Sequence, residues 1–323
     1  MRVLVTGANG FLASNILREL VARGIEVRGM IRANCNEKSL QGLTIELVRG
    51  NIVNYRDILS AATGCNVIIH AAADTSQFYS DPMPLFPVNV NSTLNVIKAA
   101  KELAVQRLIF VSTANTIGLH PDQEKNEMSK LFRKSGYALS KLRAEQYILN
   151  ETSSGKLNAV IVNPTFMLGA YDAKPSSGRI FLQLLKPKVV VYPVGGKNFI
   201  DVKCAAAAIC NAIEQGQNGG RYVLAGENLS FKEFLQLLDK IEPKRSVRIM
   251  IPAIVLTTIG AIGSFFRLLG FKVELNYYNA LILSTSEKIS GAEAEEVLLM
   301  PKTDVSKAIR DAVTWFKENG YLK

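Results

Sequence analysis

Tyr137 and Lys141 carry a phenol and an ammonium four residues apart, a spacing that puts both groups on one face of a helix. Upstream of them, an apolar run ends near Thr113, whose hydroxyl is then expected at the carboxyl edge of a sheet. These groups suit hydride transfer to a carbonyl, because the alkoxide that forms needs a proton and a phenol can donate one. A phenol has an ordinary pKa of about 10, and we expect the ammonium and an oxidised nicotinamide to lower it toward neutrality. The alternative is that Tyr137 and Lys141 only decorate a helix surface.

A glycine-containing turn between Thr6 and Ser14 follows the first predicted strand and opens a predicted helix. Gly7 permits a tight turn, and Gly10 lets backbone N–H groups approach a pyrophosphate at the positive end of the helix. Ala13 stands where a third glycine would pack the helix on the strand, and alanine is an accepted variant there. A glycine-rich turn without a ligand is the alternative, but the position after the first strand of a βαβ unit favours dinucleotide binding.

The residues after the second predicted strand indicate which dinucleotide is bound. An NAD site usually places an acid about 20 residues after the glycines to bind the ribose 2′-hydroxyl. No acid occurs between Glu26 and Glu37, and this region carries Arg28, Arg32 and then Lys38. A guanidinium suits the 2′-phosphate of NADP, so Arg32 favours NADP, with NAD as the alternative. Arg32 could otherwise be a solvated loop charge.

The first half of the chain alternates strands and helices, which must position these groups. Nearly continuous apolar runs predict strands that are buried on both faces, as in a parallel, doubly wound α/β sheet. These runs are Arg2–Thr6, Glu26–Ile31, Ile45–Val48, Val67–His70, Arg107–Ser112 and Asn158–Val162. We expect a dinucleotide-binding domain at 1–165, to which 200–225 returns. Residues 166–199 and 226–323 then form a smaller substrate-binding lobe over the carboxyl ends of the strands, where open α/β sheets bind ligands.

Composition and charge exclude several other classes of protein. The 323 residues are 48% hydrophobic and 20% charged, an ordinary globular composition, and the formal net charge of +10 suits an anionic ligand. No Lys- or Arg-rich run indicates nucleic-acid binding. The four cysteines show no C-x-x-C spacing, which argues against a metal or redox site and favours reduced thiols. With no signal-peptide pattern at the start, we expect a cytoplasmic protein.

One uncharged stretch, from Ile249 to Phe266, must be weighed as a membrane span. Pro252, Gly260 and Gly263 interrupt it. We therefore predict no transmembrane span but an apolar helix that covers a pocket or a partner subunit. Peripheral membrane contact is the alternative.

Several motifs, taken together, point to a known family: Thr6–Ala13, His70–Ala73, Asn89–Thr93, Phe110–Thr113, Tyr137–Lys141, Asn163–Thr165 and Phe199–Val202. With these motifs the chain resembles the extended short-chain dehydrogenase/reductase family, in its NAD-dependent epimerase/dehydratase superfamily. It looks most like the dihydroflavonol-4-reductase-like branch. The resemblance implies a Rossmann-type fold and an NADP-dependent oxidoreductase acting on a carbonyl or secondary alcohol. It also implies a catalytic triad, which falls on Thr113, Tyr137 and Lys141.

The resemblance further implies a set of coenzyme contacts. The pyrophosphate loop takes Gly7, Asn9, Gly10, Phe11 and Leu12, and the 2′-phosphate takes Arg32 and Lys38. The adenine takes Asn51 and Ile52, and the end of the fourth strand contributes Ala71, Ala72 and Ala73. The nicotinamide end takes Tyr137, Lys141, Pro164 and Thr165. Asn51 departs from the usual Asp of the family, but an amide oxygen can still accept the bond from adenine.

Two other functions stay open at this stage. A nucleotide-sugar epimerase or dehydratase uses the same triad with tightly held NAD, against which Arg32 argues. A dehydratase also tends to carry an Asp-Glu pair where this chain has Ala114 and Asn115. A non-catalytic dinucleotide sensor is less favoured, because both Tyr137 and Lys141 are present. The resemblance makes a homodimer an expectation, and the substrate is a small molecule that the sequence does not identify.

Overall fold

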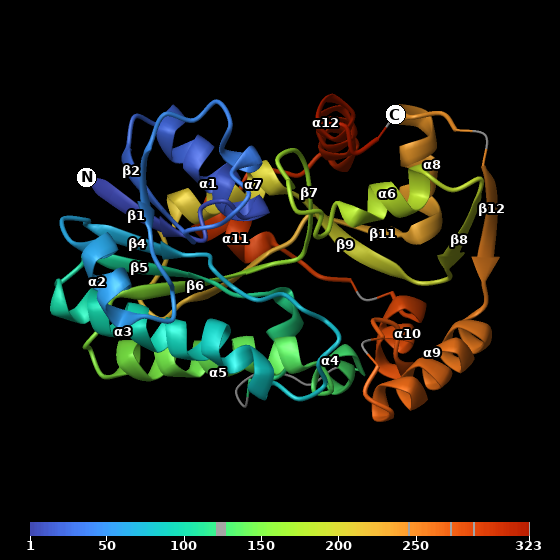
Figure 1. Ribbon diagram of the computed structural model, residues 1–323, viewed down its shortest axis with the longest axis horizontal. Helices are drawn as coiled ribbons and strands as arrows, with labels where there is room; N and C mark the ends of the chain where they lie inside the picture. The colour runs from blue at the N-terminus through green and yellow to red at the C-terminus, as the bar shows by residue number, and fades with distance from the viewer. Residues whose placement is uncertain (121–126, 245, 272, 287, 323) are drawn as a thin grey trace.

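The computed structural model describes residues 1–120, 127–244, 246–271, 273–286 and 288–322. Its main element is a seven-stranded sheet whose neighbouring strands all run parallel (Figure 1). In spatial order the strands are β10 (Arg221–Leu224), β6 (Ala159–Pro164), β5 (Arg107–Val111), β4 (Val67–His70), β1 (Arg2–Thr6), β2 (Glu26–Ile31) and β3 (Glu46–Arg49). The strand order reverses between β1 and β4, which is where a doubly wound sheet binds its ligand.

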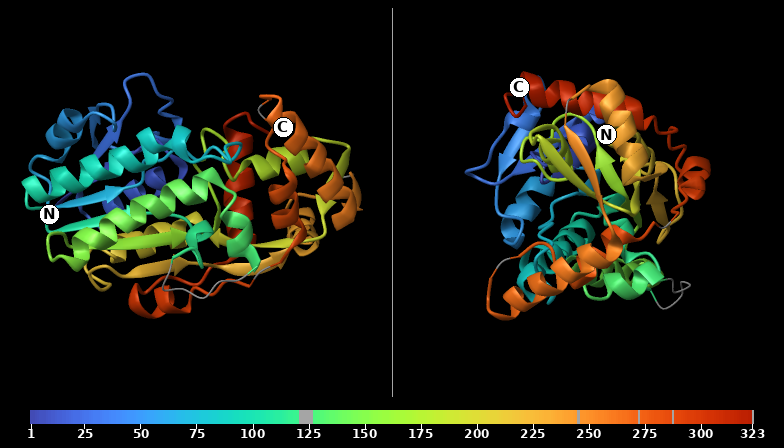
Figure 2. Two further views of the ribbon diagram at one scale, coloured as in Figure 1. Left: turned by 90° about the horizontal axis from the view of Figure 1, so that it is seen from below. Right: turned by 90° about the vertical axis from the view of Figure 1, so that its right-hand side faces the viewer.

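Helices cover both faces of this sheet (Figures 1 and 2). One face packs on α1 (Phe11–Ala22), α7 (Val202–Asn211) and α11 (Ala292–Val297), and the other on α2 (Tyr55–Ala62), α3 (Ser92–Glu102) and α5 (Gly136–Ser153). Successive residues of a strand point to opposite faces. In β1, Val3 and Val5 therefore lie in one core and Leu4 in the other, and all three are fully buried.

The six strands predicted for the first half of the chain are confirmed. Their ends shift by one or two residues at β3, β5 and β6. The prediction succeeds because burial on both faces demands an uninterrupted apolar run, which is visible in the sequence.

A second core lies beside the sheet and holds the smaller sheets (Figure 1). One contains β7 (Phe166–Leu168), β9 (Gly196–Asp201) and β11 (Glu227–Ser230), and the other pairs β8 (Val189–Pro193) with β12 (Val247–Ile251). Around them pack α6 (Arg179–Leu185), α8 (Phe231–Ile241) and α12 (Val305–Glu318). Phe199 and Phe234 are fully buried there, with stacked rings 4.6 Å apart.

One helix from the range assigned to the lobe packs on the large sheet. Ala294 and Leu298 are fully buried in the first core rather than in the lobe, although 226–323 was assigned to the lobe. The physical reason is that α11 contacts β10, the edge strand of the large sheet, and covers its apolar side.

Short segments connect these elements at the carboxyl edge of the sheet. Lys38–Leu40, Met83–Leu85 and Ala114–Thr116 are 3₁₀ turns, Pro87–Asn91 is a π-helical turn, and α4 (Glu127–Phe132) precedes α5.

We predicted one helix for the uncharged stretch at 249–266. The structure instead has the end of β12 followed by α9 (Ala253–Leu268). Pro252 separates the two, because a proline cannot donate to the sheet but fits the start of a helix. α9 packs on α10 (Tyr277–Ser284) through Gly260 and Gly263. Within the described ranges, no helix combines the length and the apolar character needed to cross a bilayer.

Candidate active site

The turn after β1 depends on two glycines. Gly7 has φ +67°, and a Cβ atom there would lie 2.8 Å from the Ala72 Cα, so only glycine fits without strain. The Gly10 N–H donates to the Gly7 carbonyl at 2.8 Å, and α1 begins at the next residue, Phe11. The first turn of α1 carries no acidic side chain. Its unpaired N–H groups therefore offer a site for a phosphate group.

Asn9 joins this turn to the loop after β2. Its side-chain amide donates to the Asn36 carbonyl at 3.0 Å, and its own carbonyl accepts from the Ser39 hydroxyl at 2.8 Å. Leu12 is buried in the core below the turn, whereas Phe11 is half-buried. The turn is thus tied to the loop after β2 and packed on the core below it.

Ala71, Ala72 and Ala73 follow β4 and lie alongside the glycine turn, each half-buried. The Ala72 N–H donates to Thr6 Oγ1 at 3.2 Å, and Thr6 Oγ1 also contacts His70 Nδ1 at 2.8 Å. Burial lowers the pKa of His70 to about 3. The imidazole is therefore neutral and acts as a hydrogen-bonded core residue.

The basic residues near the end of β2 have three different environments. Arg32 is exposed directly after the strand and forms no ion pair with another residue of the described ranges. The Lys38 ammonium donates to the Asn319 carbonyl at 2.8 Å and lies 4.9 Å from the Tyr321 ring. Arg28 is buried and donates to two backbone carbonyls at the end of α2. Arg28 also pairs with Glu46 at 2.9 Å, so its guanidinium is already engaged within the fold.

Asn51 and Ile52 follow β3. The Asn51 N–H donates to Asp57 Oδ2 at 2.7 Å, and Asn51 Oδ1 accepts from the Val53 N–H at 3.1 Å. A carbonyl oxygen has two lone pairs, so the exposed Asn51 can accept a second hydrogen bond.

Thr113, Tyr137 and Lys141 converge just beyond the carboxyl end of β5. Tyr137 and Lys141 lie on the first two turns of α5, and the Tyr137 and Thr113 side chains share a hydrogen bond. Lys141 Nζ donates to the Val111 carbonyl at 2.7 Å and lies 4.0 Å from the centre of the Phe110 ring. Thr113 and Tyr137 are 8% exposed and Lys141 is 1% exposed, so these groups do not decorate a helix surface.

Burial dominates the ionisation of both α5 side chains. It raises the pKa of Tyr137 to about 12, against the opposing effect of the Thr113 hydrogen bond, and lowers the pKa of Lys141 to about 7. The lowering expected for Tyr137 included an oxidised nicotinamide, and without one the protein groups raise the pKa of the phenol. The reason is that the Lys141 ammonium is bound to the Val111 carbonyl and the phenol lies in a desolvated position. At neutral pH the phenol keeps its proton, as a proton donor must.

A further ionisable side chain of α5, Glu145, is fully buried one turn beyond the lysine. Its Oε1 accepts from Thr116 Oγ1 at 2.9 Å, from Asn163 Nδ2 at 2.8 Å and from Ser112 Oγ. Its Oε2 contacts His120 Nε2. The sequence interpretation missed Glu145, although its spacing of four residues from the lysine was the available signal.

This network also holds the loop that carries Thr113. The Thr113 carbonyl accepts from Asn163 Nδ2 at 3.1 Å and lies 2.9 Å from Thr116 Oγ1, whose single proton it shares with Glu145 Oε1; Asn163 Nδ2 also donates to Glu145. Glu145 therefore positions Thr113 through Asn163, which lies on β6, and through Thr116, which ends the 3₁₀ turn after β5.

Pro164 and Thr165 lie where β6 enters the lobe. Pro164 is buried, and the Thr165 hydroxyl donates to Asn198 Oδ1 at 2.7 Å. Next to Asn198 on β9, the Lys197 ammonium lies 5.1 Å from the Phe166 ring, and burial lowers its pKa. Asn198 and Lys197 were not predicted, because a polar residue inside a short strand gives no motif.

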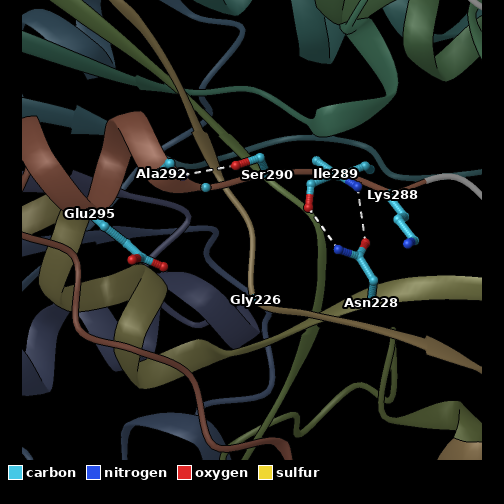
Figure 3. Close-up of a pocket in the computed structure, with 8 residues that line it drawn as sticks. Gly226, Asn228, Lys288, Ile289, Ser290, Ala292 and Glu295 are labelled. Carbon is cyan, nitrogen blue, oxygen red and sulfur yellow. Dashed lines mark hydrogen bonds between the residues drawn. The ribbon is translucent and has the colours of Figure 1, made fainter.

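A surface hollow of about 400 Å³ lies at the loop after β10 and the start of α11. Figure 3 shows its polar groups bonded to one another: Asn228 exchanges two hydrogen bonds of 3.0 Å with the Ile289 backbone, and Ser290 Oγ faces the Ala292 N–H. None of the predicted site residues lines this hollow. It is therefore separate from the triad.

Replacing Glu145 by Ala should lower the free energy of unfolding by about 3–5 kcal/mol, because its buried donors lose their acceptor. Urea denaturation followed by circular dichroism measures this difference. Glu145→Gln keeps a carbonyl acceptor in a side chain of the same size, so its free energy of unfolding should fall by less. An Ala variant as stable as the wild type would contradict the role of the network.

The low pKa of Lys141 makes stability depend on pH. An unfolded lysine keeps its proton up to about 10.5, whereas Lys141 in the fold loses it near 7, so between these pH values the unfolded state binds more protons. The contribution of Lys141 to the free energy of unfolding therefore rises with pH across that window. Denaturation of wild type and Lys141→Met, without coenzyme, should give a difference that shifts in favour of the wild type as pH increases. A difference independent of pH would show that Lys141 is not desolvated.

Comparison with known proteins adds independent evidence. Residues 3–225 match the model of the NAD dependent epimerase/dehydratase family. The chain is 31% identical over 334 residues to the "Putative dihydroflavonol 4-reductase" of Synechocystis sp., which covers 99% of this chain and 95% of that protein. It is 29% identical over 329 residues to sterol demethylase protein B of Methylococcus capsulatus, with 100% of both chains covered.

Solved structures agree with these relatives. The crystal structure of gox2253 matches with a TM-score of 0.86 and 27% identity, over 99% of both chains. The matched residues include the glycine turn, the strands of the large sheet and the buried Thr113, Tyr137 and Lys141. The chain therefore belongs to the NAD-dependent epimerase/dehydratase family, and it is an enzyme of the extended short-chain dehydrogenase/reductase type.

Proposed function

We propose that this protein is an NADP-dependent oxidoreductase that interconverts a carbonyl and a secondary alcohol on a small apolar molecule. One observation carries the proposal. The Tyr137 phenol is buried, keeps its proton at neutral pH, and is hydrogen-bonded to Thr113 at the sheet edge where the glycine turn opens.

The residues around the turn fit a dinucleotide. The close approach of Gly7 to Ala72 and the first turn of α1, which has no acidic side chain, support a pyrophosphate site at Gly7–Leu12. Arg32 is the exposed cation available for a 2′-phosphate, with Lys38 on the same loop. For the remaining contacts we propose Asn51 and Ile52, Ala71–Ala73, Pro164 and Thr165.

A bound nicotinamide supplies or accepts the hydride, and the side chains of this chain manage the proton. In the reduction, Tyr137 donates its proton to the substrate oxygen, which Thr113 holds by a hydrogen bond. The phenolate that remains favours the ammonium form of Lys141, because opposite charges stabilise each other in a desolvated site. The proton of Tyr137 stays on the product alcohol, so Lys141, whose pKa is about 7, takes up a different proton from solvent near neutral pH.

Two observations support an apolar, ring-containing substrate. The Tyr79 carbonyl accepts from the Gly136 N–H at 3.0 Å, which puts Phe78 and Tyr79 next to the start of α5, with ring centres 4.3 Å apart. The relatives named above carry the names of a dihydroflavonol and of a sterol, both of which contain fused rings.

Tyr137→Phe should reduce turnover roughly 10²–10⁴-fold, the usual contribution of a positioned proton donor, while NADPH binding stays nearly unchanged. The assay follows NADPH absorbance with the best substrate from a screen of flavonoid and steroid ketones. Tyr147→Phe removes a phenol farther along α5 and is the matched control. Turnover of the Tyr137 variant at the wild-type rate would remove the proposed mechanism.

Arg32→Ala should weaken NADPH binding roughly tenfold or more and leave NADH binding almost unchanged, because only NADPH offers a phosphate to the guanidinium. Arg49→Ala, which removes a nearby arginine paired with Glu37, is the control for a general loss of charge. An unchanged ratio of the two affinities would exclude Arg32 as the 2′-phosphate group. NAD that copurifies and resists dialysis would instead favour a nucleotide-sugar epimerase.

A further inference from the structure

α9 exposes a broad apolar surface. Its outward side chains include Ile254, Ile259, Ile262, Phe265 and Leu268, with exposed fractions from 45% at Ile259 to 86% at Leu268. No charged residue occurs in this helix before Arg267. A surface helix normally turns polar residues toward water, and an apolar surface of this kind marks an interaction site.

The inner face of α9 is too narrow to bury these side chains. It consists mainly of Leu256, Gly260 and Gly263, the buried residues of the helix. A Cβ atom on Gly263 would lie 2.0 Å from the Leu275 carbonyl oxygen, and one on Gly260 would lie 2.7 Å from the Ala280 Cβ. The glycines let α9 lie directly on α10, so the large apolar side chains remain outside.

Exposed apolar side chains also occur on the two-stranded sheet that leads into α9. In β8 and β12, Val189 pairs with Val247 and Val191 pairs with Ile249, and all four side chains are about half exposed. β12 leads straight into α9 (Figure 1), and Pro252 is the residue between them. We call the outward side chains of β8, β12 and α9 the apolar face.

One border of the apolar face is basic. Lys186 and Lys188 precede β8 and Lys244 precedes β12, and because these strands are parallel, the lysines lie at the same end of the sheet. The acids nearby in the chain are already paired: Asp239 with Arg248, Glu242 with Lys317. The border therefore keeps a positive charge.

We propose that the apolar face docks onto a lipid bilayer with anionic headgroups, with α9 lying in the interface. Apolar side chains enter the boundary between headgroups and acyl chains, and neighbouring lysines bind the anionic headgroups. A bilayer offers charge opposite to that of the lysine border, whereas a second copy of this chain offers the same charge.

The packed helices α9 and α10 also contact segments that border the candidate active site. Thr285, directly after α10, donates to the Met128 sulfur of α4 at 3.1 Å, and Arg267 of α9 donates to the Gln77 carbonyl and to Ser80 at 3.4 Å. Gln77 and Ser80 lie on either side of Phe78 and Tyr79 in the loop after β4, and the Tyr79 carbonyl accepts from the Gly136 N–H at the start of α5. An apolar substrate dissolved in the bilayer would thus be close to the triad. This last step rests on the proposed function, whereas the docking surface does not.

Vesicle flotation of the full chain tests the docking surface. Wild type should float with vesicles of phosphatidylcholine and phosphatidylglycerol, bind less to phosphatidylcholine alone, and be released by salt. The double variant Ile262→Asp/Phe265→Asp should bind roughly tenfold or more weakly, because two apolar anchors are lost. Leu299→Asp changes an exposed leucine outside this face and should bind like wild type.

Circular dichroism and NADPH binding verify that each variant is folded. Absence of wild-type binding to both kinds of vesicle would overturn the proposal. So would a dimer in solution that the double variant dissociates, since a second copy would then cover the face. Vesicle binding without carbonyl reduction would contradict the proposed function and leave the docking surface supported.

Discussion

α5 buries a row of ionisable side chains, Tyr137, Lys141 and Glu145, against the end of β5, and the rest of the site depends on this row. Each group has its own polar partner: the Thr113 side chain, the Val111 carbonyl and the donors around Glu145. A buried ionisable group without a partner costs several kcal/mol, so the helix, the strand end and the loop can meet in one arrangement only. The proton donor is therefore positioned by the fold before a substrate arrives.

The large sheet brings this row to the coenzyme side of the molecule. Because its strands are parallel, the ends of β1, β4, β5 and β6 all lie at one edge, where the order reverses between β1 and β4. The glycine turn belongs to the first of these ends and Thr113 to the third. Asn198 of the lobe binds Thr165 at the fourth, which ties the substrate side to the same edge.

Sequence patterns within a single strand, turn or helix predicted the features that depend on that element alone. The strands, the glycine turn and the pair of Tyr137 and Lys141 were predictable, because each is a run or a spacing within one element. The burial of Arg28, the network of Glu145 and the raised pKa of Tyr137 were not. Each depends on which groups from distant segments surround a side chain, and sequence spacing does not contain that information. The stretch at 249–266 lies between these cases. Pro252 was a visible interruption and membrane contact was an open alternative, but the sequence did not show which of its side chains point outward.

A crystal structure of the protein grown with NADPH tests the central claim most directly. The account predicts the pyrophosphate on the N–H groups of Gly7–Phe11 and the nicotinamide end next to Lys141, with the Tyr137 oxygen facing the place of the transferred hydride. A coenzyme bound elsewhere, or a Tyr137 hydroxyl turned away from the nicotinamide, would contradict it.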